Sequence, residues 1–247
     1  MLAILRKEIN GFFSSLTGYI VIAAYLLVNS LFMWIFPGEW NIFDSGYAGL
    51  DTLFFLSPWI FLFLVPAVTM RMFAEEKRLG TIELILSRPV TERGIIWGKY
   101  FASEALVLLA LLPGIIYYIS VFMLGEMPGN LDKGGTLGAY IGLFFLASVY
   151  ASAGLFASSL TDNQVIAFIL AVFLCFVMFM GFDSVAYLPG LKHFDEFIIR
   201  LGINEHYRSM SRGVIDIRDI VYFISVVVIF IESTRMVLLS RKWKRKS

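Results

Sequence analysis

The sequence is poor in charge and nearly devoid of cysteine and histidine. Only 16% of its 247 residues are charged, whereas a typical soluble domain has about 25%. The single cysteine, Cys175, cannot form a disulfide within the chain and offers no CxxC metal or redox motif. It lies in an apolar run, so we interpret it as a buried apolar residue. GxSxG nucleophile and HExxH zinc motifs are also missing.

Two patterns resemble cofactor sites without meeting their requirements. One is a group of side chains that could in principle hold a metal ion: His193, His206, Glu196 and Glu205. We interpret them instead as solvated residues at the membrane interface. The other is the run from Gly94 to Tyr100, which superficially resembles a phosphate loop. It is one residue too short, and Tyr100 stands where a serine or threonine must reach magnesium. We therefore expect no cofactor, metal or catalytic residue in this chain, which is not predicted to be an enzyme.

Hydrophobic residues dominate the composition. They make up 59% of the chain, above the 45–50% of soluble domains, and the mean hydropathy is +0.79. A helix needs about 20 mostly apolar residues to cross a bilayer, and helices satisfy their backbone hydrogen bonds internally. The sequence therefore predicts one all-α, polytopic membrane domain over residues 1–247. Its six spans are expected at about 17–36, 52–70, 100–124, 136–160, 164–182 and 220–239.

Lysine and arginine are distributed unevenly between the predicted spans. Two precede the first span, six lie in the 71–99 segment and five follow the sixth span, whereas 37–51 has none and 125–135 has only Lys133. The positive-inside rule places basic segments in the cytoplasm. It predicts that both termini and the 71–99 segment are cytoplasmic. The segment 183–219 must then lie outside, although it contains five basic residues.

Two segments outside the spans have apolar residues at helical spacing. Residues 1–16 predict an amphipathic helix on the cytoplasmic surface. The run after them is too long for a signal-peptide core and lacks a cleavage site, so we expect an uncleaved first span. In 183–219, residues such as Phe197 and Leu201 predict short helices that dip into the outer interface.

Small residues at helical spacing precede and continue into span four, including Gly134, Gly138 and Gly142. Small residues let helices approach closely in lipid, so we interpret this span as an internal packing helix rather than a subunit interface. Prolines predict kinks in two other spans, at Pro58, Pro66 and Pro113.

Two glutamates fall inside apolar runs, where a carboxylate is costly. Glu104 is expected to lie near the cytoplasmic end of span three, within reach of Lys99 or water. Glu232 precedes Arg235 by three residues, a spacing that favours an ion pair on one helix face. We interpret both as structural. The alternative is a polar lining or an ion relay.

The 71–99 segment has the most specific local pattern. Its charged first part ends at Gly80, a residue suited to ending a helix. Thr81 can cap a second, short helix with apolar residues such as Ile82 and Leu84, which Pro89 would end. A short apolar-faced helix in the cytoplasm favours a protein partner. The alternative is a helix that rests on lipid.

This segment resembles the corresponding segment of ABC-2-type transporter permeases, whose pattern runs roughly E-x-x-x-G-T-[IL]-E-L-L-L-S-x-P-[VI]-[ST]. The matching residues are Glu76, Gly80, Thr81, Ile82, Glu83, Leu84, Leu86, Ser87, Pro89, Val90 and Thr91. The amphipathic N-terminus and the six spans also resemble the family. Within it, the chain looks most like the permease of the gliding-motility-associated transporter of Bacteroidota.

The resemblance implies a permease that pairs with a second, identical or different permease chain, with spans one and five at the interface. Separate ATPase subunits would hold ATP and magnesium and bind the short helix after Gly80, which would act as the coupling helix. Glu75, Glu76 and Glu83 would be charged anchors, and Leu84 would be a packing anchor. The resemblance also implies a location in the bacterial inner membrane, and export is the expected direction of transport. We hypothesise that Asn29 and Ser30 lie near the path.

Other functions remain open from the residues alone. The chain could be a membrane scaffold that moves nothing, or a secondary transporter that uses Glu104 or Glu232. A lipid-modifying enzyme would need a polar catalytic cluster, which the sequence does not show. Membrane lipid is an expected partner in every case, and nucleic acid is not.

Overall fold

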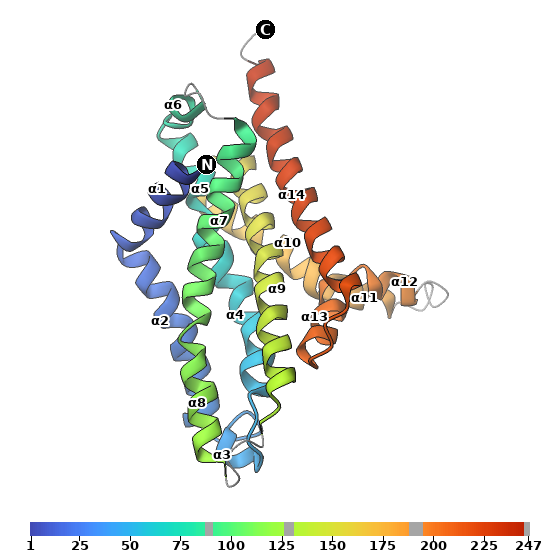
Figure 1. The fold of residues 1–247 in the computed structure, drawn as a ribbon. Helices are drawn as coiled ribbons and strands as arrows, with labels where there is room; N and C mark the ends of the chain where they lie inside the picture. The colour runs from blue at the N-terminus through green and yellow to red at the C-terminus, as the bar shows by residue number, and fades with distance from the viewer. Residues whose placement is uncertain (87–90, 126–130, 188–194, 245–247) are drawn as a thin grey trace.

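A computed structural model describes residues 1–86, 91–125, 131–187 and 195–244 of the chain. In these residues the secondary structure is helical throughout, with no strand (Figure 1). Six helical segments are long and apolar enough to cross a membrane. The predicted fold class, an all-α polytopic membrane protein, is therefore confirmed.

Four of the six spans are built from consecutive helical pieces. In chain order, the six spans are formed by α2 (Leu16–Ser30) with η1 (Leu31–Ile35), α4 (Asp51–Thr69) with α5 (Arg71–Arg78), α7 (Glu92–Leu111) with α8 (Gly114–Leu124), α9 (Lys133–Leu160), α10 (Gln164–Phe176) with η2 (Val177–Gly181) and α11 (Phe182–Ala186), and α14 (Ile217–Lys244). The shorter helices are α1 (Leu2–Phe13), α3 (Ile42–Ser45), α6 (Ile82–Leu86), α12 (Asp195–Arg200) and α13 (Ile203–Ser211).

The helices of spans two and three extend further than hydropathy predicts. The predicted span bounds at residues 70 and 100 mark where the apolar windows meet charged residues. Helix α5 continues span two to Arg78, and α7 begins at Glu92. Thr91 caps α7, since its hydroxyl accepts the Gly94 N–H at 3.2 Å, as expected for a helix that leads into span three. Pro113 separates α7 from α8, whereas Pro58 and Pro66 lie within a continuous α4.

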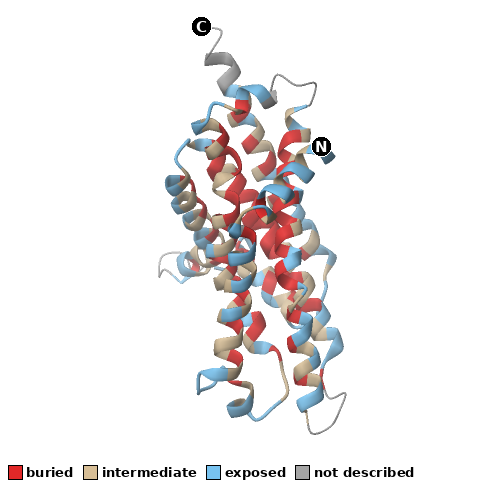
Figure 2. Cartoon of the chain, turned by 90° about the vertical axis from the view of Figure 1, so that its left-hand side faces the viewer, coloured by how far each residue is buried: buried red, intermediate tan, exposed pale blue. Residues whose placement is uncertain are grey.

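Helix α9 lies at the centre of the bundle. Seventy-eight per cent of its membrane window is buried, against 22% for spans one and five. It packs against α4, α5, α7, α10, α13 and α14, and Figure 2 shows the buried residues gathered in the middle of the molecule. A Cβ added at Gly138 would lie 2.8 Å from Gly213 Cα, and one at Gly142 would lie 3.0 Å from Met210 Cβ. The small residues of span four thus serve packing within the chain, as predicted.

The two ends of the bundle differ. The N-terminus, α6 and the end of α14 lie at one end, and α3 and the end of α8 lie at the other (Figure 1). This matches the prediction that the termini and the 71–99 segment share one side. The predicted outer segment forms α11, α12 and α13, and α13 packs beside the first half of α9. His206 links it to α14, with Nδ1 2.7 Å from Asp219 Oδ1.

Candidate functional site

The helix break at Met70 positions α5, the first part of the predicted cytoplasmic segment. A broken helix leaves backbone groups that need partners, and Ser158 at the end of α9 supplies them. Its hydroxyl accepts the N–H groups of Phe73 and Ala74, each at 3.0 Å, and donates to the Met70 carbonyl at 2.8 Å. Lys77 Nζ also donates to the Ser159 carbonyl. Helix α5 is therefore tied to the end of the central helix.

Replacing Ser158 with alanine is expected to destabilise the protein by about 1–3 kcal/mol, because buried N–H groups lose their acceptor. Thermal unfolding in detergent measures the effect. Ser159→Ala is the matched control, since within the described residues the Ser159 hydroxyl bonds the Phe156 carbonyl of its own helix and no backbone group of α5. Equal shifts for the two variants would contradict the role given to Ser158.

A buried ion cluster lies beside α5 and is centred on Lys99, whose side chain is 1% exposed. The ammonium donates to Glu8 Oε1 and Glu76 Oε1, both at 2.8 Å, and to the Met72 carbonyl at 2.7 Å. Its three protons therefore have three acceptors, as a buried charge requires. Because Glu8 lies on α1, Glu76 on α5 and Lys99 on α7, the cluster joins three elements that are distant in the sequence.

Lys7 completes the ion cluster from the outside. Its ammonium lies 2.8 Å from Glu76 Oε1 and 3.4 Å from Glu8 Oε1. Partial burial opposes its charge, but the hydrogen bond and charge of Glu76, with Glu8, raise the pKa of Lys7 above its ordinary value. Two lysines and two glutamates make the cluster neutral. Helix α1 thus docks on the protein, and a Cβ added at Gly98 of α7 would lie 3.1 Å from the Met1 carbonyl oxygen.

Gly80 and Thr81 turn the chain from α5 into α6. Gly80 has φ +69°, a left-handed conformation that favours glycine, and its N–H donates to the Lys77 carbonyl at 3.2 Å. Thr81 precedes α6 as predicted, but its hydroxyl donates back to the Glu76 carbonyl at 3.4 Å. Gly80 therefore ends α5 as the sequence predicts, and Thr81 ties the turn to α5.

Helix α6 presents one face inward and another outward. Ile82 is buried at 7% exposure, whereas Leu84 is 67% exposed and Glu83 is also exposed. Of the other expected anchors, Glu75 is half-buried and Glu76 faces the interior of the ion cluster. Pro89, with residues 87–90, lies outside the described residues. Leu84 and Glu83 are thus the expected anchors that the surface presents most openly.

The intramembrane polar residues have partners within the bundle. Glu104 is buried and accepts from Ser148 Oγ at 3.0 Å. Lys99, expected from the sequence as its neighbour, bonds Glu8, Glu76 and Met72 instead. Glu104 lies about three turns into α7, because the helix begins at Glu92.

The remaining polar candidates are also bonded. Glu232 forms the predicted pair with Arg235 at 3.0 Å and a second one with Arg93 of α7, also at 3.0 Å. In span one, Asn29 is buried and donates to the Tyr25 carbonyl at 2.9 Å. Ser30 Oγ lies 2.7 Å from the Tyr117 hydroxyl. The Ser30 and Arg93 contacts join different helices, whereas the Asn29 amide bonds within α2. Among the described residues, Asn29 Oδ1 and Glu104 Oε1 are buried without a hydrogen-bond partner.

The possible metal ligands do not form a site in the described residues. No group of three histidine, cysteine, aspartate or glutamate side chains there could hold a metal ion. His206 instead pairs with Asp219, while His193 lies outside the described residues.

Sequence reasoning identified α6 but missed the ion cluster. From the sequence, Lys99 is expected only as a possible neighbour of Glu104, and Glu8 is not singled out. The available signal was a lysine seven residues inside a helix that continues into an apolar run. Its partners could not be inferred, because they lie 23 and 91 residues away in the chain.

Comparison with known proteins agrees with this architecture. A family model described as ABC-2 family transporter protein matches residues 3–211. A comparison with curated proteins returned no match. The matched region covers most of the chain, including α1, the ion cluster and α6, together with five of the six spans. The chain therefore belongs to the ABC-2 transporter family, as a multi-pass membrane component.

Proposed function

We propose that this chain is the permease subunit that couples ATP hydrolysis, performed by a separate ATPase, to export of a substrate across the bacterial inner membrane. The observation that carries the proposal is α6, a short helix held by Gly80 at the end of the bundle that bears both termini, with Leu84 and Glu83 facing outward. An exposed leucine beside a glutamate suits a protein groove that offers an apolar pocket and a basic rim.

The contacts of α5 provide a route from α6 into the membrane. Movement of α6 would pull on α5 through Gly80 and Thr81. From α5, Glu76 would carry the movement to α7 and α1 through Lys99, and the Met70 break would carry it to α9 through Ser158. Because buried ion pairs and packed helices resist gradual deformation, these elements would move as connected bodies.

A second permease chain would pair through the exposed spans. Spans one and five have the smallest buried share, 22% each, which supports the interface that the family resemblance implies. ATP and magnesium would be held by the ATPase. The positive-inside rule supports a cytoplasmic position for α6 and both termini. A link to gliding motility would follow from the permease subtype that the sequence resembles.

Co-purification tests the coupling role of α6. The tagged chain, expressed with its native partners, should retain an ATP-hydrolysing subunit in mild detergent. Glu83→Lys should reduce the retained ATPase about tenfold or more, since like-charge contact at an interface costs several kcal/mol. Glu39→Lys is the matched control, because Glu39 is exposed between η1 and α3 at the opposite end.

Two outcomes would contradict the proposal. Retention of the ATPase by Glu83→Lys at the wild-type level would remove α6 as its docking helix. Absence of any ATPase from the wild-type preparation would favour the scaffold or the secondary transporter.

A further inference from the structure

A cavity of about 430 Å³ lies between α4, η2 and α13. This volume is within the range of small-ligand sites. Its apolar wall includes Phe55, which is 55% exposed, and Trp59, whose ring packs edge-to-face on Phe179 with centroids 5.5 Å apart. None of these residues takes part in the ion cluster or in α6. The cavity is thus separate from the coupling site.

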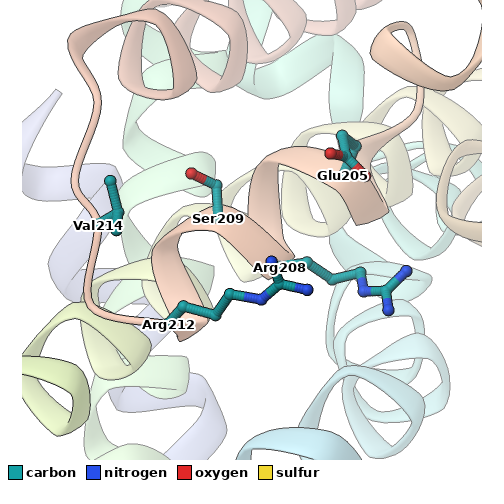
Figure 3. Close-up of a pocket in the computed structure, with 5 residues that line it drawn as sticks. All are labelled: Glu205, Arg208, Ser209, Arg212 and Val214. Atoms are coloured by element: carbon teal, nitrogen blue, oxygen red, sulfur yellow. The ribbon is translucent and has the colours of Figure 1, made fainter. Parts of the chain in front are cut away.

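Two opposite charges line the same cavity. Asp51 is the first residue of α4, and Arg208 lies on α13. Both side chains are exposed, and neither takes part in an ion pair within the described parts of the chain. Figure 3 shows the Arg208 side chain extended away from Ser209. The cavity therefore offers a carboxylate and a guanidinium to one occupant.

The neighbouring hollow on α13 has a different character. It measures about 280 Å³, and its lining includes Glu205, Arg208 and Arg212 (Figure 3). It lacks the aromatic wall, and Arg212 does not line the larger cavity. Arg208 thus lies between the two hollows, and only the larger one combines charges with an apolar surface.

The depth of the larger cavity matches the boundary between lipid headgroups and acyl chains. Asp51 begins a membrane span, and Trp59 lies eight residues, or roughly 12 Å, further along the helix. Charged span ends lie at headgroup level, and tryptophan is enriched at the interface. A lipid headgroup would thus meet Asp51 and Arg208, with its chains against Phe55 and Trp59.

We propose that this cavity binds a zwitterionic aminophospholipid of the surrounding bilayer, of the phosphatidylethanolamine type. Guanidinium groups bind phosphate through paired hydrogen bonds, so Arg208 receives the phosphate. The Asp51 carboxylate receives the ammonium. An anionic phospholipid without an ammonium would leave Asp51 unpaired and repelled, so the two charges together select the zwitterion.

Native mass spectrometry of the full chain tests this selection. The protein is purified from bilayers that contain equal amounts of phosphatidylethanolamine and phosphatidylglycerol, and the retained lipids are counted. Wild type should retain phosphatidylethanolamine about fivefold over phosphatidylglycerol, the ratio expected for one exposed ion pair of about 1 kcal/mol. Asp51→Asn should abolish the preference by raising retained phosphatidylglycerol. Arg208→Gln should lower the retention of both lipids.

Arg212→Gln is the matched control, because it removes a guanidinium from the same helix outside the cavity. It should keep the wild-type preference. Equal retention of both lipids by wild type, or equal effects of Arg208→Gln and Arg212→Gln, would overturn the proposal and indicate unselective annular lipid. Should Arg208→Gln fail to fold, the Asp51→Asn result still shows whether the cavity selects phosphatidylethanolamine over phosphatidylglycerol. The measurement needs no ATPase, so its result does not depend on whether the proposed coupling role is correct.

Discussion

Lys99→Met is expected to destabilise the protein by about 3–5 kcal/mol, because it leaves the buried Glu76 and the partly buried Glu8 with only the exposed Lys7 as a cation. Glu8 and Glu76 both lie 2.8 Å from the Lys99 ammonium, and the Met72 carbonyl loses its partner as well. The midpoint of thermal unfolding in detergent should fall by about 6–20 °C.

Two further variants identify the cause of that loss. Lys7→Met removes a cation from the same cluster, but Lys7 is 59% exposed, so the expected change is within about 1 kcal/mol. The double variant Lys99→Met/Glu76→Gln should recover part of the lost stability, since one uncompensated charge is gone. An additive loss in the double variant would show that Lys99 acts by packing rather than by charge.

Gly138→Ala is expected to separate α13 from α9. The added Cβ would lie 2.8 Å from Gly213 Cα and 2.9 Å from the Met210 carbonyl oxygen. Both neighbours are backbone atoms, so relief requires a shift of α13 as a whole. Overpacking of this kind costs about 1–3 kcal/mol, and the shift should also lower lipid retention at Arg208.

Gly134→Ala is the matched control in the same helix. A Cβ there meets only Asp132 Oδ1, at 3.5 Å, and alanine is a better helix former than glycine by up to about 1 kcal/mol. The two substitutions should therefore shift the unfolding midpoint in opposite directions. A stabilising Gly138→Ala would mean that α13 does not sit against α9 in the membrane.

Local patterns predicted the features that depend on neighbouring residues. The six spans follow from apolar composition over windows of about 20 residues, and the turn at Gly80 follows from the conformational freedom of glycine. The same windows mark the apolar parts of spans two and three and do not give the ends of their helices. The charged residues of α5 extend span two beyond its apolar window, and Thr91 caps the start of α7, because helix formation and capping do not depend on hydropathy.

The sequence by itself determined that this is an all-α membrane protein with a short, apolar-faced helix between spans two and three. Tertiary structure decided which charges meet. Lys99 bonds Glu8 and Glu76 rather than Glu104, and Ser158 bonds the broken backbone at Met70. It also placed Arg208 and Asp51 on one cavity. The physical reason is that hydropathy and capping act over a few residues, whereas buried charges take whichever partner the packed helices bring within hydrogen-bond distance.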